Sequence, residues 1–215
     1  MDNITGLARE LAHLFPEWAL SWSLRLASER DSRAFWDLAT YRPAGDAGDI
    51  RSDQPLVRLL GQQSAPQLIY ERALARDEAP RFGIDPEVYR RTFWGLRPDF
   101  VVEADEGSTL LILEAKGGQL SDAVWRNPKE LLYHRFLQAC TTLKTKGLFY
   151  IVPGAVAEKC ADCLKNQFPQ DPSVAMGILT WEGLLPLIYE RLVETSLDQM
   201  IREMEGLKHL RAWRA

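Results

Sequence analysis

The 215-residue sequence contains only three cysteines and three histidines, and this scarcity limits the metal and disulfide chemistry open to it. Cys160 and Cys163 form a C-x-x-C pair, but residues 155–168 have the apolar spacing of an amphipathic helix. Structural zinc and iron–sulfur sites usually take four Cys or His ligands, and the remaining Cys140 and histidines form no second pair. We therefore expect buried free thiols rather than a zinc or iron–sulfur site.

Long apolar runs are also missing. No stretch approaches the ~20 apolar residues that span a bilayer. The first fifteen residues mix charged and apolar side chains and do not resemble a basic leader followed by an apolar stretch. Low-complexity segments and internal repeats are absent as well. These absences predict a soluble cytoplasmic protein that does not associate with membranes.

An excess of positive charge is the third absence, because the formal net charge is −4. This balance argues against a protein that coats nucleic acid non-specifically. It is neutral towards a nuclease, whose acidic metal ligands can coexist with a local basic strip. The hydrophobic content of 46% suits one compact domain with additions.

The first part of the chain, residues 1–60, is predicted to be a helical N-terminal extension. Its expected elements are helices over 4–14 and 16–29, a third helix capped by Asp31, and a Gly-, Asp- and Pro-rich loop over 41–55. The tryptophans Trp18, Trp22 and Trp36 need apolar cover. We therefore expect this extension to pack on the main core or on a partner.

Residues 61–215 alternate between helical and extended patterns. The predicted elements are a helix over 65–77, a helical turn from Asp85, strands over 91–95, 98–104 and 109–115, a helix over 129–143, a strand over 147–152, a helix over 155–168, a strand over 174–180, and helices over 181–192 and 197–213. This order predicts an α/β fold, in which a central mixed sheet is flanked by helices.

Two carboxylates and a lysine are predicted to meet at one end of this sheet. Asp99 begins one strand, and Glu114 lies near the end of the next, two residues before Lys116. Side chains alternate along a strand, so Glu114 and Lys116 share a face, and a hairpin at residues 105–107 brings Asp99 opposite them. Carboxylate oxygens hold Mg²⁺, and an ammonium group beside the metal orients a water or stabilises developing charge. The alternative without a metal site is that Asp99 lies in a turn and that Glu114 and Lys116 form an ordinary solvated strand end.

Pro98-Asp99, followed after fourteen residues by Glu114-Ala115-Lys116, resembles the signature of the PD-(D/E)XK nuclease superfamily. The resemblance covers about residues 64–152 and implies a restriction-endonuclease-like core. It implies that Asp99, Glu114 and the Ala115 carbonyl bind Mg²⁺ or Mn²⁺ and that Lys116 is the catalytic lysine. The implied function is phosphodiester hydrolysis, in DNA, by a restriction, defence or repair type of endonuclease. The alternative is an inactive nuclease-fold protein that works as a binding or assembly module.

Further candidates are weaker. Many members of that superfamily add a carboxylate from the helix before the strands, and Glu71 occupies that position, although a solvated helical Glu is equally compatible with the pattern. Arg126 and Gln138 are candidate substrate contacts, each against a bland packing or solvated role. Gly117 lets the chain turn sharply at the end of the strand. This turn either allows the backbone of a substrate to approach closely or is a simple turn without a functional role. The N-terminal helices or the C-terminal helix are candidate surfaces for a homodimer or a protein partner.

Overall fold

A computed structural model describes residues 15–44, 53–60, 66–74, 76–117, 128–168, 171–196, 199–203 and 205. The predicted helix over 4–14, the candidate substrate residue Arg126 and most of the predicted C-terminal helix lie outside these ranges.

The chain forms an α/β structure around a mixed seven-stranded sheet with the order β2-β1-β7-β6-β5-β4-β3. The strands are β1 (Thr40–Pro43), β2 (Gln54–Pro55), β3 (Gln67–Tyr70), β4 (Phe100–Ala104), β5 (Thr109–Ala115), β6 (Thr145–Val152) and β7 (Ala175–Thr180). The three central strands β5, β6 and β7 are parallel, and every other pairing is antiparallel. All seven residues of β5 are buried, as expected for a parallel strand covered on both faces.

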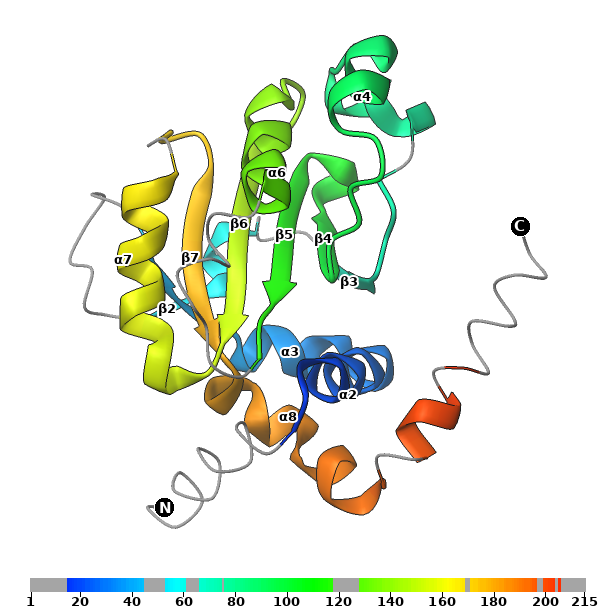
Figure 1. Ribbon diagram of the computed structural model, residues 1–215, viewed down its shortest axis with the longest axis vertical. Helices are drawn as coiled ribbons and strands as arrows, with labels where there is room; N and C mark the ends of the chain where they lie inside the picture. Colours follow the sequence, from blue (N-terminus) through cyan, green and yellow to red (C-terminus); the bar gives the residue numbers. More distant parts are fainter. Residues whose placement is uncertain are drawn as a thin grey trace.

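Helices cover both faces of the sheet (Figure 1). They are α2 (Glu17–Arg30), α3 (Ser32–Leu38), α4 (Pro86–Thr92), α6 (Pro128–Ala139), α7 (Ala157–Gln167) and α8 (Trp181–Glu194), together with the short 3-10 helices η1 (Leu56–Leu59), η2 (Arg76–Phe82), η3 (Asp105–Gly107) and η4 (Gly154–Val156). One core joins α4, η2, α6 and α7 to the sheet. A second core joins α2, α3 and α8 to the opposite face. None of these helices is long and apolar enough to cross a bilayer within the ranges that the structure describes.

Several sequence predictions are confirmed. The second and third helices form as α2 and α3, and the Asp31 side chain accepts hydrogen bonds from two backbone N–H groups of α3. The hairpin at residues 105–107, the four predicted strands from 98 to 180 and the helices predicted over 129–143, 155–168 and 181–192 are present. Trp22 and Trp36 are buried in the core that α2 and α3 share with the sheet, so this region packs on the main core. The boundary near residue 60 stays a prediction.

Three predicted elements are wrong. The segment predicted as a helix over 65–77 contains β3, which lies at the sheet edge and pairs with β4, so tertiary pairing overrides its helix-forming composition. The segment predicted as a strand over 91–95 continues α4 into a turn, because Asp85 caps that helix and Pro86 occupies its first position. Parts of the predicted loop over 41–55 are the short strands β1 and β2.

The cysteine prediction is largely confirmed. Cys140 and Cys160 are buried free thiols, whereas Cys163 is half-buried. Burial raises the pKa of both Cys140 and Cys160 to about 12, so these thiols stay protonated at neutral pH. They act as small apolar side chains of the core.

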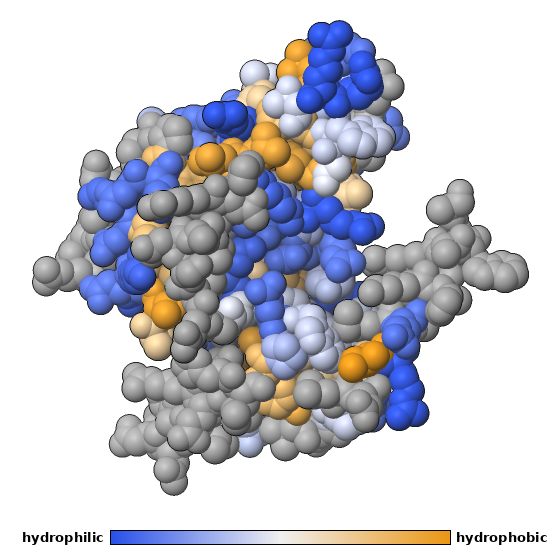
Figure 2. Space-filling view, viewed as in Figure 1, coloured by the Kyte–Doolittle hydropathy of each residue, from blue (hydrophilic) through white to orange (hydrophobic). Residues whose placement is uncertain are grey.

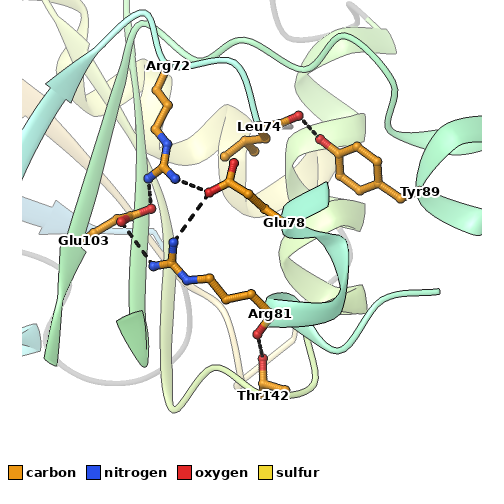
Figure 3. Close-up of polar contacts among 7 residues, drawn as sticks. All are labelled: Arg72, Leu74, Glu78, Arg81, Tyr89, Glu103 and Thr142. Atoms are coloured by element: carbon orange, nitrogen blue, oxygen red, sulfur yellow. Dashed lines mark hydrogen bonds and ion pairs between the residues drawn. The ribbon is translucent and has the colours of Figure 1, made fainter. Parts of the chain in front are cut away.

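Four charged side chains connect η2 with the C-terminal end of β4 (Figure 3). We call this set, which consists of Arg72, Glu78, Arg81 and Glu103, the edge network. Arg72 pairs with Glu78 and Glu103, and Arg81 places its guanidinium 3.1 Å from Glu103 Oε2 and 3.5 Å from Glu78 Oε1. Two positive and two negative groups alternate, so each carboxylate faces two guanidinium groups. Charge is balanced within this network.

Candidate active site

The pairing of β4 with β5 brings Asp99 and Glu114 together. Phe100 faces Leu113 in this antiparallel ladder, so the next position along places Asp99 opposite Glu114. The Ala115 N–H donates to Asp99 Oδ2 at 2.8 Å, and the Asp99 N–H donates to Glu114 Oε1 at 3.3 Å. The predicted convergence of the two carboxylates is therefore present.

Lys116 completes the predicted set on the same face. Its ammonium nitrogen lies 3.1 Å from Glu114 Oε2 and 3.1 Å from an oxygen of Glu130, which comes from the first turn of α6. Its backbone is held from both sides, because its N–H donates to the Ile151 carbonyl at 2.8 Å and its carbonyl accepts from Trp181 Nε1 at 3.0 Å. The lysine is therefore fixed in position and charge-paired.

The electrostatics favour a charged lysine. Burial acts to lower the pKa of Lys116, but the carboxylates of Glu114 and Glu130 outweigh it and raise that pKa above its ordinary value. Glu130 is anchored in turn by the Tyr150 hydroxyl, which donates to Glu130 Oε2 at 2.8 Å. Burial and the adjacent Glu130 raise the pKa of Tyr150 well above its ordinary value, so this hydroxyl stays a donor.

Asp99 has no cationic side chain bonded to it among the described residues. Burial, and then the charge of the adjacent Glu114, raise the pKa of Asp99 to about 7. A carboxylate with a raised pKa beside a second carboxylate is typical of a site that gains from a bound cation. This cluster, which we call the β5 cluster, consists of Asp99, Glu114, Lys116 and Glu130.

The oxygen donors near Asp99 fit a hard divalent cation. The N–H and C=O groups of one strand residue point to the same side, so the Ala115 carbonyl faces the side on which its N–H bonds Asp99. Carboxylates of Asp99 and Glu114 and this carbonyl are the oxygen ligands that Mg²⁺ and Mn²⁺ prefer. No group of three Asp, Glu, His or Cys side chains in the described ranges is arranged to hold a metal ion. Such a site therefore depends on two side chains, a backbone oxygen and water.

Helix α2 brings a further carboxylate that the sequence analysis did not single out. Glu17 opens α2, and its Oε2 accepts the Gly117 N–H at 2.7 Å. A Cβ on Gly117 would lie 2.8 Å from the Glu17 Cβ, so glycine permits this approach. The close approach expected at Gly117 is thus made by α2. Glu17 also contributes to the raised pKa of Asp99.

Neither Glu17 nor Glu130 carried a signal in the sequence. Each is a single acidic residue in the first turn of a helix, where acids commonly complement the helix dipole. The hydrogen bond between Glu17 and Gly117 joins residues 100 positions apart. Only the fold reveals such a contact.

Glu71 reaches the neighbourhood by another route than the one predicted. It lies in a turn directly after β3, with a φ of 46°, and not on a helix. Its N–H donates to the Asp99 carbonyl at 2.7 Å, so its backbone lies beside Asp99. Glu71 also interacts with the Tyr70 hydroxyl. Its role as a metal ligand stays a prediction.

Gln138 is engaged elsewhere. It lies eight residues after Glu130 on α6, about 12 Å along the helix axis. Its amide nitrogen donates to Asp171 Oδ2 at 3.1 Å. This contact ties α6 to the segment before β7, and the substrate role of Gln138 stays a prediction.

Hydrophilic side chains cover part of the molecular surface, and a second lysine lies beside the β5 cluster. In Figure 2, hydrophilic side chains occupy the middle of the visible surface, between the α4 lobe at the top and the helices at the bottom. Lys129 lies beside Glu114, with 3.8 Å between its ammonium nitrogen and Glu114 Oε1, and its ammonium group sits over the Tyr133 ring. Glu114 is therefore next to two ammonium groups, those of Lys116 and Lys129.

Comparison with known proteins adds no relative. No family model, curated protein or solved structure matches the chain.

Proposed function

We propose that the chain is a divalent-metal-dependent nuclease with a restriction-endonuclease-like core, and that it hydrolyses phosphodiester bonds in DNA. The observation that carries the proposal is the placement of Asp99 opposite Glu114, with Lys116 on the same face of the sheet. The PD-(D/E)XK resemblance supports the same assignment.

Each residue has a distinct role in this proposal. Asp99, Glu114 and the Ala115 carbonyl would hold Mg²⁺ or Mn²⁺, which supplies Lewis-acid polarisation of the phosphate when bound. Lys116 holds an ammonium group where it orients the attacking water and stabilises the charge that develops on the phosphate. Two further acidic residues border the site: the Glu17 carboxylate accepts the Gly117 N–H, and the Glu71 backbone N–H donates to the Asp99 carbonyl.

Glu130 and Tyr150 act as positioning residues. Lys116 bonds both Glu114 and Glu130, so a cation that occupies Glu114 would leave Lys116 held by Glu130. The hydrogen bond from Tyr150 fixes the Glu130 carboxylate for this task. A fixed ammonium group loses less orientational entropy during the reaction.

The test is cleavage of plasmid and oligonucleotide substrates with Mg²⁺ or with EDTA. Wild-type protein should cleave with Mg²⁺ only, and Lys116→Ala should abolish cleavage. Lys144→Ala is the matched control, because Lys144 is exposed and lies before β6, at the end of the sheet away from Lys116. Cleavage that survives Lys116→Ala would point to a contaminating enzyme and would sink the proposal.

A second candidate is a protein that keeps this fold and works as a binding or assembly module. It is favoured by the closed pairing of Lys116 with two carboxylates, which a purely structural ion pair would share. Calorimetric titration with Mn²⁺ separates the two. Binding that is lost in Asp99→Ala supports the nuclease, and absence of binding supports the module.

A further inference from the structure

An open pocket of about 670 Å³ lies between η2 and α4, away from the β5 cluster. Its walls include Leu74, Pro80, Pro86 and Trp94, and Asp77 is the only charged residue among the described lining. Apolar walls with one polar group are typical of sites that bind a small organic group. None of these residues takes part in the proposed metal chemistry.

Trp94 is the most exposed large apolar side chain of the described residues, at 70%. Its neighbour Phe93 is buried, and Gly95 has a φ of 79° that favours glycine. A Cβ at Gly95 would meet nothing within 4 Å, so this side of the pocket is open. An indole held by a buried neighbour on one side and an open glycine on the other presents a surface for stacking.

The pocket is firmly attached to the rest of the fold. The Leu74 N–H donates to the Leu96 carbonyl at 3.2 Å, which joins its two walls. The Tyr89 hydroxyl donates to the Leu74 carbonyl (Figure 3). The edge network holds the η2 wall on β4. The pocket is therefore largely formed before any ligand arrives.

Basic residues lie on both sides of Trp94 in the sequence, and another basic residue, Lys129, lies beside the β5 cluster. Arg91 lies three residues before Trp94 and Arg97 three residues after it, and both are exposed. Neither forms an ion pair with a described carboxylate. The Arg97 carbonyl accepts a hydrogen bond from the Tyr133 hydroxyl at 2.9 Å, and the Lys129 ammonium lies over the Tyr133 ring. The Arg97 backbone thus contacts Tyr133, whose ring carries the Lys129 ammonium beside Glu114.

We propose that this pocket binds an unpaired nucleobase of a single-stranded nucleic acid, stacked on Trp94, while Arg91 and Arg97 contact the phosphates on either side. The inference rests on the proposed nuclease function and specifies its substrate as single-stranded or frayed. The Asp77 carboxylate repels phosphate and accepts a hydrogen bond from a base amino group, so it favours the base as occupant. Apolar walls and exposed arginines together match a base and its backbone.

The short chain segment between the pocket and Asp99 gives an upper limit on the distance between the stacked base and the scissile phosphate. Asp99 lies four positions after Gly95 in the chain, which is at most ~14 Å of extended chain. This is about four nucleotides at the ~3.4 Å rise per nucleotide of one strand. The stacked base therefore lies within a few nucleotides of the cleaved bond.

The test uses fluorescence anisotropy with labelled oligonucleotides in EDTA, so that binding is measured without cleavage. The probes are single-stranded DNA of 12 nucleotides (about three times the spacing above), the same length of RNA, and a blunt duplex. Trp94→Ala should weaken single-strand binding about tenfold and duplex binding less than about twofold. Trp94→Phe should retain most of the single-strand affinity.

Val57→Ala is the matched control, because Val57 is exposed at 45% and follows β2 at the opposite edge of the sheet. It should bind every probe as the wild type does. Thermal unfolding should give the same midpoint for Trp94→Ala as for the wild type, since the indole is mostly exposed. The DNA and RNA arms identify which single strand is preferred.

Three outcomes overturn the inference: unchanged single-strand binding by Trp94→Ala, an equal loss on single strand and duplex, or the same loss in Val57→Ala. Each would assign the pocket to another occupant, such as a peptide. Cleavage by the wild type in Mg²⁺ is measured separately. Cleavage with Trp94-independent binding leaves the nuclease and removes the base pocket. Trp94-dependent binding without cleavage leaves the pocket and removes the nuclease, and absence of both removes both.

Discussion

The edge network and the β5 cluster lie at opposite ends of β4, on one face of the same strand, yet they differ in charge balance. Glu103 in the edge network faces two guanidinium groups, Arg72 and Arg81. Asp99, four residues earlier, bonds a backbone N–H and has a second carboxylate, Glu114, beside it. The same strand therefore carries a balanced ionic cluster that stabilises the fold and a cluster with surplus carboxylate that suits a cation.

The largest expected effect separates the two clusters by activity. Glu114→Gln should lower the Mg²⁺-dependent cleavage rate by at least about 100-fold, because it removes a charged metal ligand. Glu103→Gln should leave the rate within about threefold, since Glu103 lies in the edge network. Single-turnover cleavage assays check both variants. Equal losses in the two variants would contradict the functional difference between the clusters.

The edge network should matter for stability, although it does not matter for the cleavage rate. Glu103→Gln should lower the free energy of unfolding by about 2 kcal/mol, because it leaves two partly buried guanidinium groups with one charged partner fewer. Urea unfolding in EDTA measures this change. Arg33→Gln, which breaks a fully exposed pair with Asp37 on α3, is the control and should change stability by less than about 0.5 kcal/mol. An unaltered midpoint for Glu103→Gln would show that the edge network is not a stabilising element.

Positioning of Lys116 should have a smaller effect than loss of a ligand. Glu130→Gln keeps the shape and the bond from Tyr150 but weakens the hold on Lys116, so kcat should fall about tenfold with KM within about twofold. Glu130→Asp should restore part of the rate, because it keeps the charge. Steady-state kinetics on an oligonucleotide substrate measure both constants. A change in KM alone would indicate a substrate contact instead of a positioning role.

The smallest effect concerns the raised pKa of Asp99. The pKa of Asp99 is about 7 in the folded protein, whereas an unfolded Asp has a pKa of ~3.9. The folded state therefore binds more protons between these two values, and the contribution of Asp99 to stability decreases as pH rises through that window. Asp99→Asn should stabilise the metal-free protein at pH ~8 by at least about 1 kcal/mol, since one pKa unit corresponds to ~1.4 kcal/mol, and have no such effect at pH ~4.

Urea unfolding in EDTA at the two pH values checks this prediction. Saturating Mn²⁺ should stabilise the wild type and leave Asp99→Asn nearly unchanged. Destabilisation of the Asp99→Asn protein at the higher pH would contradict this prediction. It would mean that groups of the protein itself stabilise the Asp99 carboxylate without a bound cation.

The strands that carry Asp99 and Glu114 were readable from the sequence because local and global signals agree there. β5 is a continuous apolar run, and Glu106 and Gly107 both take the positive φ of the tight turn before it. Register then follows from the turn, and with it the placement of the two carboxylates.

The rest of the neighbourhood could not be read in this way. The pattern over 65–77 predicts a helix, but residues 67–70 of this segment form β3 because the edge of β4 offers them hydrogen-bonding partners. Glu71 consequently lies in a turn and not on a helix. Glu17 reaches the site from a helix 100 positions away from Gly117, and Glu130 reaches it from the helix that follows β5. A single acidic residue in a first helical turn does not predict such a contact.

Anomalous scattering from a crystal soaked with Mn²⁺ tests the central difference between the two clusters most directly. The account predicts one strong peak about 2.2 Å from oxygens of Asp99, Glu114 and Ala115, with no peak at the edge network. A peak between Glu78 and Glu103, or none at the β5 cluster at saturating Mn²⁺, would contradict it.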